Sequence, residues 1–114
     1  MVKAASQNGT AEAFDLELRR GALVVAVLSQ LHSEQYGYSL KKALSERGLD
    51  IEEGTLYPLL RRLETQGLLD SSWRIEEGRP RRYYVLNKHG ELVLQELTVH
   101  WRTLVRAMDR LLKG

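Results

Sequence analysis

The segment from Glu53 to Leu69 constrains the fold more than any other part of this chain. Its leucines recur at the spacing that forms one stripe of an α-helix, at Leu56, Leu59, Leu60 and Leu63. The stripe predicts an amphipathic helix that packs on a core and stops at Gly67, since a left-handed glycine commonly ends a helix. Because proline is tolerated only near the first turn, Pro58 places the expected helix start at Gly54 or Thr55.

The other side of this helix carries hydroxyl, aromatic and guanidinium groups. Thr55, Pro58 and Arg62 lie opposite the leucines, and Tyr57 and Arg61 flank them. Such groups suit backbone phosphates and the edges of DNA bases. We therefore expect this face to contact nucleic acid.

A shorter helix is expected just upstream, over residues 36–48. Leu40 and Leu44 recur on its inner face, whereas Lys41 and Lys42 lie outward. Two short helices joined by a tight link, the second with a polar reading face, are typical of a helix-turn-helix. From these two helices alone, an ordinary helical hairpin is the alternative.

A pair of strands is expected after these helices. Residues 69–76 alternate apolar and polar side chains, residues 77–80 predict a turn, and residues 81–86 are rich in aromatic and branched side chains. One half-buried face of the first strand would carry Leu69, Ser71, Trp73 and Ile75. A hairpin is stable only when it packs on other elements. Together with the helices it predicts a winged helix.

Positive charge is concentrated on the second strand and its turn. Residues 78–88 contain Arg79, Arg81, Arg82 and Lys88 and no acidic residue, in a chain with a formal net charge of +2. Arginines at the tip of a projecting hairpin would reach backbone phosphates or the minor groove. The alternative for a short basic cluster is a solvated face without a partner.

The flanking segments complete the expected domain organisation. Residues 1–9 predict a flexible tail, because they are small and polar without periodicity. Residues 10–31 predict a helix that is apolar nearly all round in its middle, so something beyond the domain's own core should cover it. We expect a winged helix-turn-helix domain over residues 10–87 and a C-terminal dimerisation helix over residues 88–114. The fold class is thus mainly α with a small β-hairpin.

The C-terminal helix is expected to start at Asn87, a good N-cap residue. Its apolar side chains follow a heptad seam, at Leu94, Leu97, Trp101, Leu104, Met108 and Leu111. Such a seam usually packs on a partner helix, which predicts a homodimer that also uses the apolar first helix. The alternative is that the helix folds back on its own domain.

Composition excludes several other classes of protein. A chain of 114 residues with 43% hydrophobic residues predicts one soluble domain. Without a long apolar run or a signal-peptide pattern, we expect a cytoplasmic protein that does not enter membranes. The chain has no cysteine and its three histidines show no ligand spacing, so no disulfide, metal site or cofactor is expected. No nucleophile–base pair, carboxylate pair or phosphate loop indicates an enzyme.

The order and spacing of these motifs resemble the PadR family of bacterial transcriptional regulators. The resemblance covers about residues 16–112, and its motifs are Tyr36-Gly37-Tyr38, Glu53 to Pro58, Arg62-Leu63-Glu64, Gly67-Leu68-Leu69, Trp73, Gly78 to Tyr84, and Leu86 with Gly90. The single short C-terminal helix resembles the small PadR subfamily of dimeric winged-helix repressors, some of which sense planar aromatic drugs.

The resemblance implies roles for particular residues. Tyr38, Thr55, Tyr57 and Arg61 would lie at the DNA face, and Gly78, Arg79 and Arg81 would form the wing tip. With the outward polar residues of both helices, the expected DNA-binding set is Tyr38, Lys42, Thr55, Tyr57, Pro58, Arg61, Arg62, Gly78, Arg79 and Arg81. Trp101 would stack on a planar aromatic effector at the dimer interface, or be a plain core or interface tryptophan.

The function expected from these observations is a homodimeric repressor that binds a pseudo-palindromic operator in double-stranded DNA. Its own or adjacent genes are the expected targets, and an aromatic effector would release it. The alternative is an adaptor that keeps the winged helix for protein interactions without binding DNA specifically.

Overall fold

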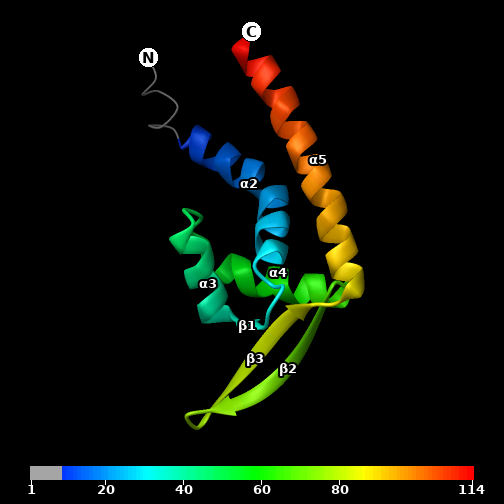
Figure 1. Ribbon diagram of the computed structural model, residues 1–114. Coiled ribbons are helices and arrows are strands. Elements are labelled where there is room, and N and C mark those ends of the chain that lie inside the picture. Colours follow the sequence, from blue (N-terminus) through cyan, green and yellow to red (C-terminus); the bar gives the residue numbers. More distant parts are fainter. Residues whose placement is uncertain (1–8) are drawn as a thin grey trace.

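The computed structural model describes residues 9–114, so most of the expected N-terminal tail lies outside the described residues. Helices and short strands follow one another in the order expected for a winged helix (Figure 1). The helices are α2 (Thr10–Ser29), α3 (Gly37–Glu46), α4 (Glu53–Thr65) and α5 (Lys88–Lys113). The strands are β1 (Gln35–Tyr36), β2 (Leu69–Glu76) and β3 (Arg79–Leu86). The predicted fold class, mainly α with a small antiparallel hairpin, is confirmed.

The elements are arranged around the pair of α3 and α4. α2 and α5 extend from this pair to one side, and the hairpin of β2 and β3 projects to the opposite side (Figure 1). We call this hairpin, residues 69–86, the wing. The molecule is elongated as a result, with principal extents of 54 × 32 × 24 Å.

The core is built mainly from leucines of all the helices. The stripe predicted for α4 is buried as expected. It packs with Val27 and Leu28 of α2, Leu31 just after α2, Leu40 and Leu44 of α3, Leu69 and Leu86 of the wing, and Leu94 of α5. Burial of each such side chain contributes roughly 1.5–3 kcal/mol, so this cluster is the main source of stability.

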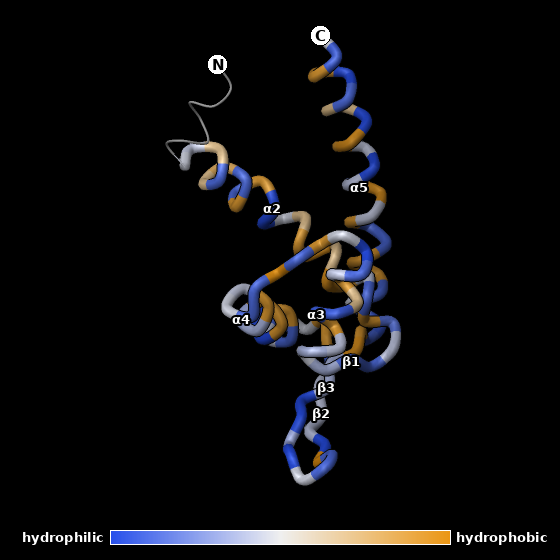
Figure 2. The backbone as a smooth tube through the Cα atoms, turned by 90° about the vertical axis from the view of Figure 1, so that its left-hand side faces the viewer, coloured by the Kyte–Doolittle hydropathy of each residue, from blue (hydrophilic) through white to orange (hydrophobic). Residues whose placement is uncertain are grey.

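α2 enters the core only with its second half. The helix begins at Thr10 after Gly9, whose φ of 68° is left-handed, and Asp15 pairs with Arg19 inside the helix. Residues 9–21 are exposed, and hydrophobic positions alternate with polar ones along this half of α2 and along α5 (Figure 2). Both helices therefore carry apolar side chains that their own domain leaves uncovered.

α4 begins at Glu53, one residue before the earliest expected start. Pro58 therefore lies in the second turn, where it has no N–H to donate to the carbonyl of Gly54. Gly54 is exposed, so water can take the place of that bond. The expectation that Pro58 must sit in the first turn was wrong because solvent tolerates this gap.

The wing is part of a three-stranded antiparallel sheet with the order β1-β3-β2. β1 pairs with β3 through Gln35–Tyr84 and Tyr36–Tyr83, and it ties the wing to the start of α3. Only the hairpin was predicted from the sequence. A strand as short as β1 has no alternation of its own that could reveal it.

The wing turn is tighter than expected. Glu77 and Gly78 have φ values of 52° and 74°, which match a two-residue type I′ turn, so Arg79 and Pro80 already belong to β3. The expected half-buried face also ends early, because Trp73 is 64% exposed and Ile75 is 79% exposed. The outer half of the wing projects beyond the helices that cover its base (Figure 1).

Across residues 9–114 the structure contains no helix with the length and hydropathy needed to cross a lipid bilayer.

Candidate nucleic-acid interface

The polar residues of α4 face two different grooves. On one side, Thr55, Pro58 and Arg62 line a groove of about 310 Å³ together with Arg20 and Leu23 of α2. On the other side, Tyr57 and Arg61 line a groove of about 320 Å³ that opens toward the wing. The polar face of α4 that the sequence predicted is thus divided between two grooves. Only the groove that contains Tyr57 is also lined by residues of the wing.

The residues of α3 that the sequence analysis selected are on the surface. Tyr38 is exposed in the first turn, and its ring stacks on that of Tyr36 at 6.4 Å between centroids. Ser39 Oγ accepts a hydrogen bond from the Tyr36 N–H at 3.1 Å and donates one to the Tyr36 carbonyl at 3.0 Å, which fixes this end of the helix. Lys42 is exposed one turn further along.

The three arginines of β3 occupy three different environments. Arg79 is exposed beside the turn, opposite Glu76 in the strand register. Arg81 is half-buried: its Nη1 lies 3.2 Å from Glu76 Oε1, and its guanidinium carbon lies 4.6 Å from the centre of the Tyr36 ring. Of the predicted tip residues, Gly78 and Arg79 are at the tip, but Arg81 is not.

Arg82 lies at the base of the wing and not at its tip. Its Nη2 donates to Glu64 Oε1 at 2.9 Å, and its Nε donates to Ser71 Oγ at 3.1 Å. Because Arg82 follows Arg81 in the sequence, it was expected with the tip arginines. The antiparallel register instead pairs it with Trp73, well inside the strand.

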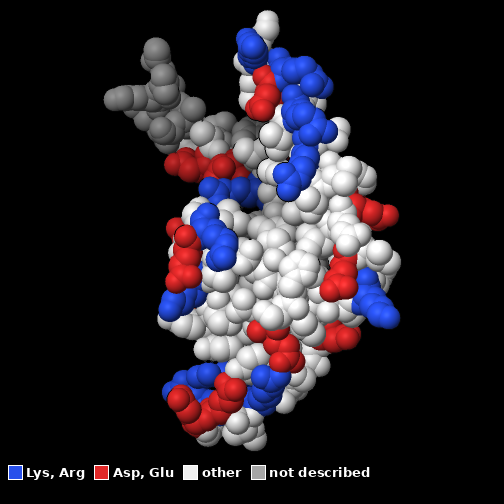
Figure 3. All heavy atoms as spheres, viewed as in Figure 1, with Lys and Arg blue, Asp and Glu red and all other residues white. Residues whose placement is uncertain are grey.

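Acidic residues from neighbouring elements reduce the positive charge of the wing. Residues 78–88 contain no acid, but Glu76 and Glu77 of the other side of the hairpin reach Arg81, and Glu64 of α4 reaches Arg82. Acidic and basic side chains are mixed at the projecting end of the wing (Figure 3). Counting charges within one strand missed these partners, although cross-strand pairing in a hairpin would have suggested Glu76.

The contacts around Glu76 shift the pKa of Glu76 and the pKa values of its neighbours Arg81 and Tyr83. The hydroxyl of Tyr83 donates to Glu76 Oε1, and this bond, with the charge of Arg81, lowers the pKa of Glu76 although desolvation opposes the shift. The same bond raises the pKa of Tyr83. Burial disfavours the charge on Arg81, but Tyr36 and Glu76 outweigh this effect and raise its pKa. Glu76 and Arg81 therefore remain ionised in the folded wing near neutral pH.

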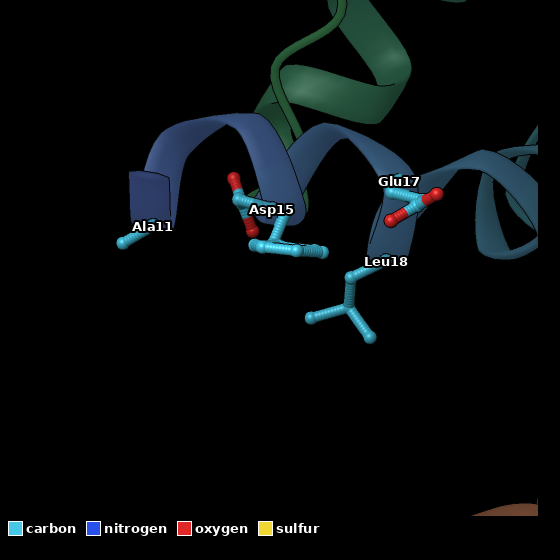
Figure 4. Close-up of a pocket in the computed structure, with 5 residues that line it drawn as sticks. Ala11, Asp15, Glu17 and Leu18 are labelled. Carbon is cyan, nitrogen blue, oxygen red and sulfur yellow. The ribbon is translucent and has the colours of Figure 1, made fainter. Parts of the chain in front are cut away.

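The predicted C-terminal seam is divided between the core and the surface. Leu94 is buried in its own domain and Leu97 packs against that core. Beyond them Trp101, Leu104 and Met108 are 43%, 53% and 40% exposed, and Leu111 is more exposed still. On α2 an exposed apolar row includes Ala11 and Leu18, which project from the same side of the helix (Figure 4).

Comparisons with known proteins agree with this architecture. The family model described as "Transcriptional regulator PadR-like family" matches residues 24–96. The transcriptional regulator Rv3488 of Mycobacterium tuberculosis is 40% identical over 81 residues, which cover 70% of this chain and 76% of that protein. The crystal structure of a PadR family transcriptional regulator from Eggerthella lenta is similar with a TM-score of 0.84 and 46% identity, covering 94% of this chain and 96% of that one. A PadR-like transcriptional regulator from Bacillus cereus gives a TM-score of 0.75 and 29% identity, covering 86% and 98% of the two chains.

Proposed function

Because this chain belongs to the PadR-like family of transcriptional regulators, which are not enzymes, we propose that it acts as a homodimeric DNA-binding repressor. Two copies of α4 would enter successive major grooves of a pseudo-palindromic operator, and the wings would contact the flanking backbone. The proposed targets are the protein's own gene and adjacent genes.

The groove between α4 and the wing is the observation that carries this proposal. Tyr57 and Arg61 of α4 line it together with Trp73, Pro80 and Arg81 of the wing. Aromatic rings and guanidinium groups on one surface suit sugars, bases and phosphates. Tyr38, Lys42 and Arg79 extend this exposed set on α3 and at the wing tip.

The uncovered apolar faces support the homodimer. α2 and α5 extend away from the wing, and each leaves apolar side chains in solvent, among them Phe14, Leu18 and Leu104 (Figure 1). A second copy of the chain could cover these apolar faces and form a dimer with two-fold symmetry. The two half-sites of a pseudo-palindromic operator have the same symmetry.

The position of Trp101 supports a proposed effector site at the dimer interface. Trp101 is the first exposed residue of the α5 seam and lies near the middle of the whole seam, where two-fold symmetry would bring it near its symmetry mate. A planar aromatic compound stacked on both indoles would favour one subunit arrangement and change the spacing of the two α4 helices. Fluorescence titration in a Trp73→Phe background tests this, and a flat titration would contradict it.

A gel shift with the DNA upstream of the protein's own gene tests the main proposal. The assay uses two salt concentrations and an excess of nonspecific competitor DNA. A shift that survives competitor, weakens in Arg61→Gln and persists in Arg110→Gln would support it, since Arg110 lies on α5 in the last turn. Binding that competitor abolishes, at this fragment and across a genomic fragment library, would favour the adaptor function.

A further inference from the structure

Three side chains from three elements form a closed triangle where the wing meets α4. Glu64 of α4 accepts from Arg82 Nη2 at 2.9 Å and, through its other oxygen, from Ser71 Oγ at 2.6 Å. Arg82 of β3 completes the triangle by donating from Nε to Ser71 Oγ of β2 at 3.1 Å. Each side of the triangle thus joins a different pair of elements.

The guanidinium of Arg82 is also held by aromatic rings. Its central carbon lies 5.6 Å from the centres of both the Trp73 and the Tyr84 rings. Its side chain retains 34% of its exposure and that of Glu64 retains 28%, whereas Arg79 is exposed at the turn. The charge of Arg82 and two of its three nitrogens, Nε and Nη2, are therefore already engaged within the protein.

The triangle has a particular place in the fold. Within residues 9–114, the Glu64 contacts are the side-chain hydrogen bonds that connect α4 directly to the strands of the wing. The backbone pairing of β1 with β3 fixes the edge of the wing against the start of α3. Leu69 and Leu86 anchor the base of the wing in the core, and the triangle lies further along the strands, where it can restrain the tilt of the projecting part toward or away from α4.

We propose that Glu64 and Arg82 are positioning residues that set the angle between the wing and α4, and that Arg82 keeps Glu64 as its partner when DNA is bound. This inference rests on the proposed function, because it assumes that α4 and the wing contact the same DNA. If Arg82 left Glu64 for a phosphate, the carboxylate would remain half-buried without its partner, which is unfavourable.

A double-mutant cycle distinguishes this positioning role from a phosphate contact. Glu64→Gln and Arg82→Gln should each lower the ratio of operator to nonspecific affinity by up to about fivefold, the loss expected for a partly exposed ion pair. In the double variant this ratio should fall no further than in the single variant with the larger loss, because the two single variants and the double variant all break the same interaction. The dependence of affinity on salt should stay unchanged in the Arg82 variant.

Glu77→Gln is the matched control, since it removes one negative charge from the wing without touching the triangle. It should tighten operator and nonspecific binding equally and leave their ratio unchanged. Two results together would overturn the proposal: Glu64→Gln behaves like this control, and in Arg82→Gln the slope of log affinity against log salt concentration falls by about one. They would identify Arg82 as a phosphate contact.

A second measurement does not depend on DNA binding. The chain has no cysteine, so spin labels at Glu53→Cys of α4 and Ile75→Cys of the wing report one distance between these two elements. Diluting labelled chains with unlabelled ones removes distances between subunits. Glu64→Gln and Arg82→Gln should broaden the distance distribution, and Glu77→Gln should leave it narrow.

A distribution that stays narrow in both triangle variants would overturn the positioning role. Circular dichroism melts verify that each variant is folded before the comparison. If the unmodified protein binds no operator, the proposed function fails, whereas the distance measurement still tests whether the triangle holds the wing.

Discussion

The ring of Tyr57 occupies the space that a side chain at Gly37 would need. A Cβ atom at Gly37 would lie 2.3 Å from Tyr57 Cε1 and 2.4 Å from the Tyr57 hydroxyl oxygen. Gly37 is the first residue of α3, and Tyr57 lies on α4. The missing side chain therefore lets an aromatic ring of one helix close against the other at the edge of the groove.

Gly37→Ala should displace the Tyr57 ring and lower the free energy of unfolding by about 1–3 kcal/mol, the usual effect of overpacking. It should also reduce the preference for the operator over other DNA. Gly21→Ala is the control: it lies within α2, has open space around it, and should stabilise the protein by up to about 1 kcal/mol. Urea unfolding compares the two, and equal effects would contradict the role of the Tyr57 contact.

Asn87→Ala should destabilise the start of α5. Asn87 Oδ1 accepts from the Gly90 N–H at 2.8 Å, and its Nδ2 donates to the Gly67 carbonyl at 3.0 Å. Loss of an N-cap costs about 1 kcal/mol. Asn87→Ser keeps a capping oxygen and loses the bond to Gly67, so its unfolding free energy should fall between those of the other two proteins. Equal losses in both variants would rule out the cap as the cause.

Leu104→Glu should dissociate the proposed homodimer. Because the dimer is two-fold symmetric, the substitution removes one leucine from each of its two subunits. Burial of each leucine at the interface contributes roughly 1.5–3 kcal/mol to the free energy of association. Val99→Glu introduces the same charge at a similarly exposed apolar residue of α5 outside the seam, and it should leave the dimer intact. Sedimentation velocity measures the mass of each variant. A Leu104→Glu dimer as tight as the Val99→Glu dimer would exclude the seam from the interface.

The Tyr83 contact predicts how Glu76 titrates. The folded-state pKa of Glu76 lies below its ordinary value of 4.5, so its contribution to stability is present above about pH 4.5. That contribution is lost as the pH falls through the lowered pKa. In Tyr83→Phe the largest cause of the shift is absent, and the pKa should move up toward 4.5. NMR titration of the Glu76 carboxyl carbon measures both values, and identical curves would contradict the assigned cause.

Local patterns in the sequence were sufficient to predict most of the helical framework. The leucine stripe of α4 and the cap at Asn87 each depend on residues within one or two turns, and both occur as expected. The heptad of α5 was also read correctly as a helix. Its spacing could not indicate where burial ends, because Leu94 and Trp101 occupy equivalent seam positions although only Leu94 reaches the core.

Features that depend on distant residues were not predictable in this way. Arg82 was placed with the tip arginines because it follows Arg81 in the sequence. Its partner Glu64 lies on another element, and only the folded chain brings the two together. β1 was missed for a similar reason, since the partner strand determines its conformation. The division of the α4 surface into two grooves likewise depends on where α2 and the wing lie.

The pairing of Tyr36 with Tyr83 also has a consequence for the order of folding. The chain between these two residues contains α3, α4 and β2, so β1 can join β3 only by closing a long loop. Such closure carries an entropy cost, and long-range contacts form more slowly than local ones. The α3–α4 pair and the hairpin each depend on contacts close in sequence, so each can form before the loop closes. The sheet is therefore completed late, when β1 joins the preformed hairpin at Tyr36.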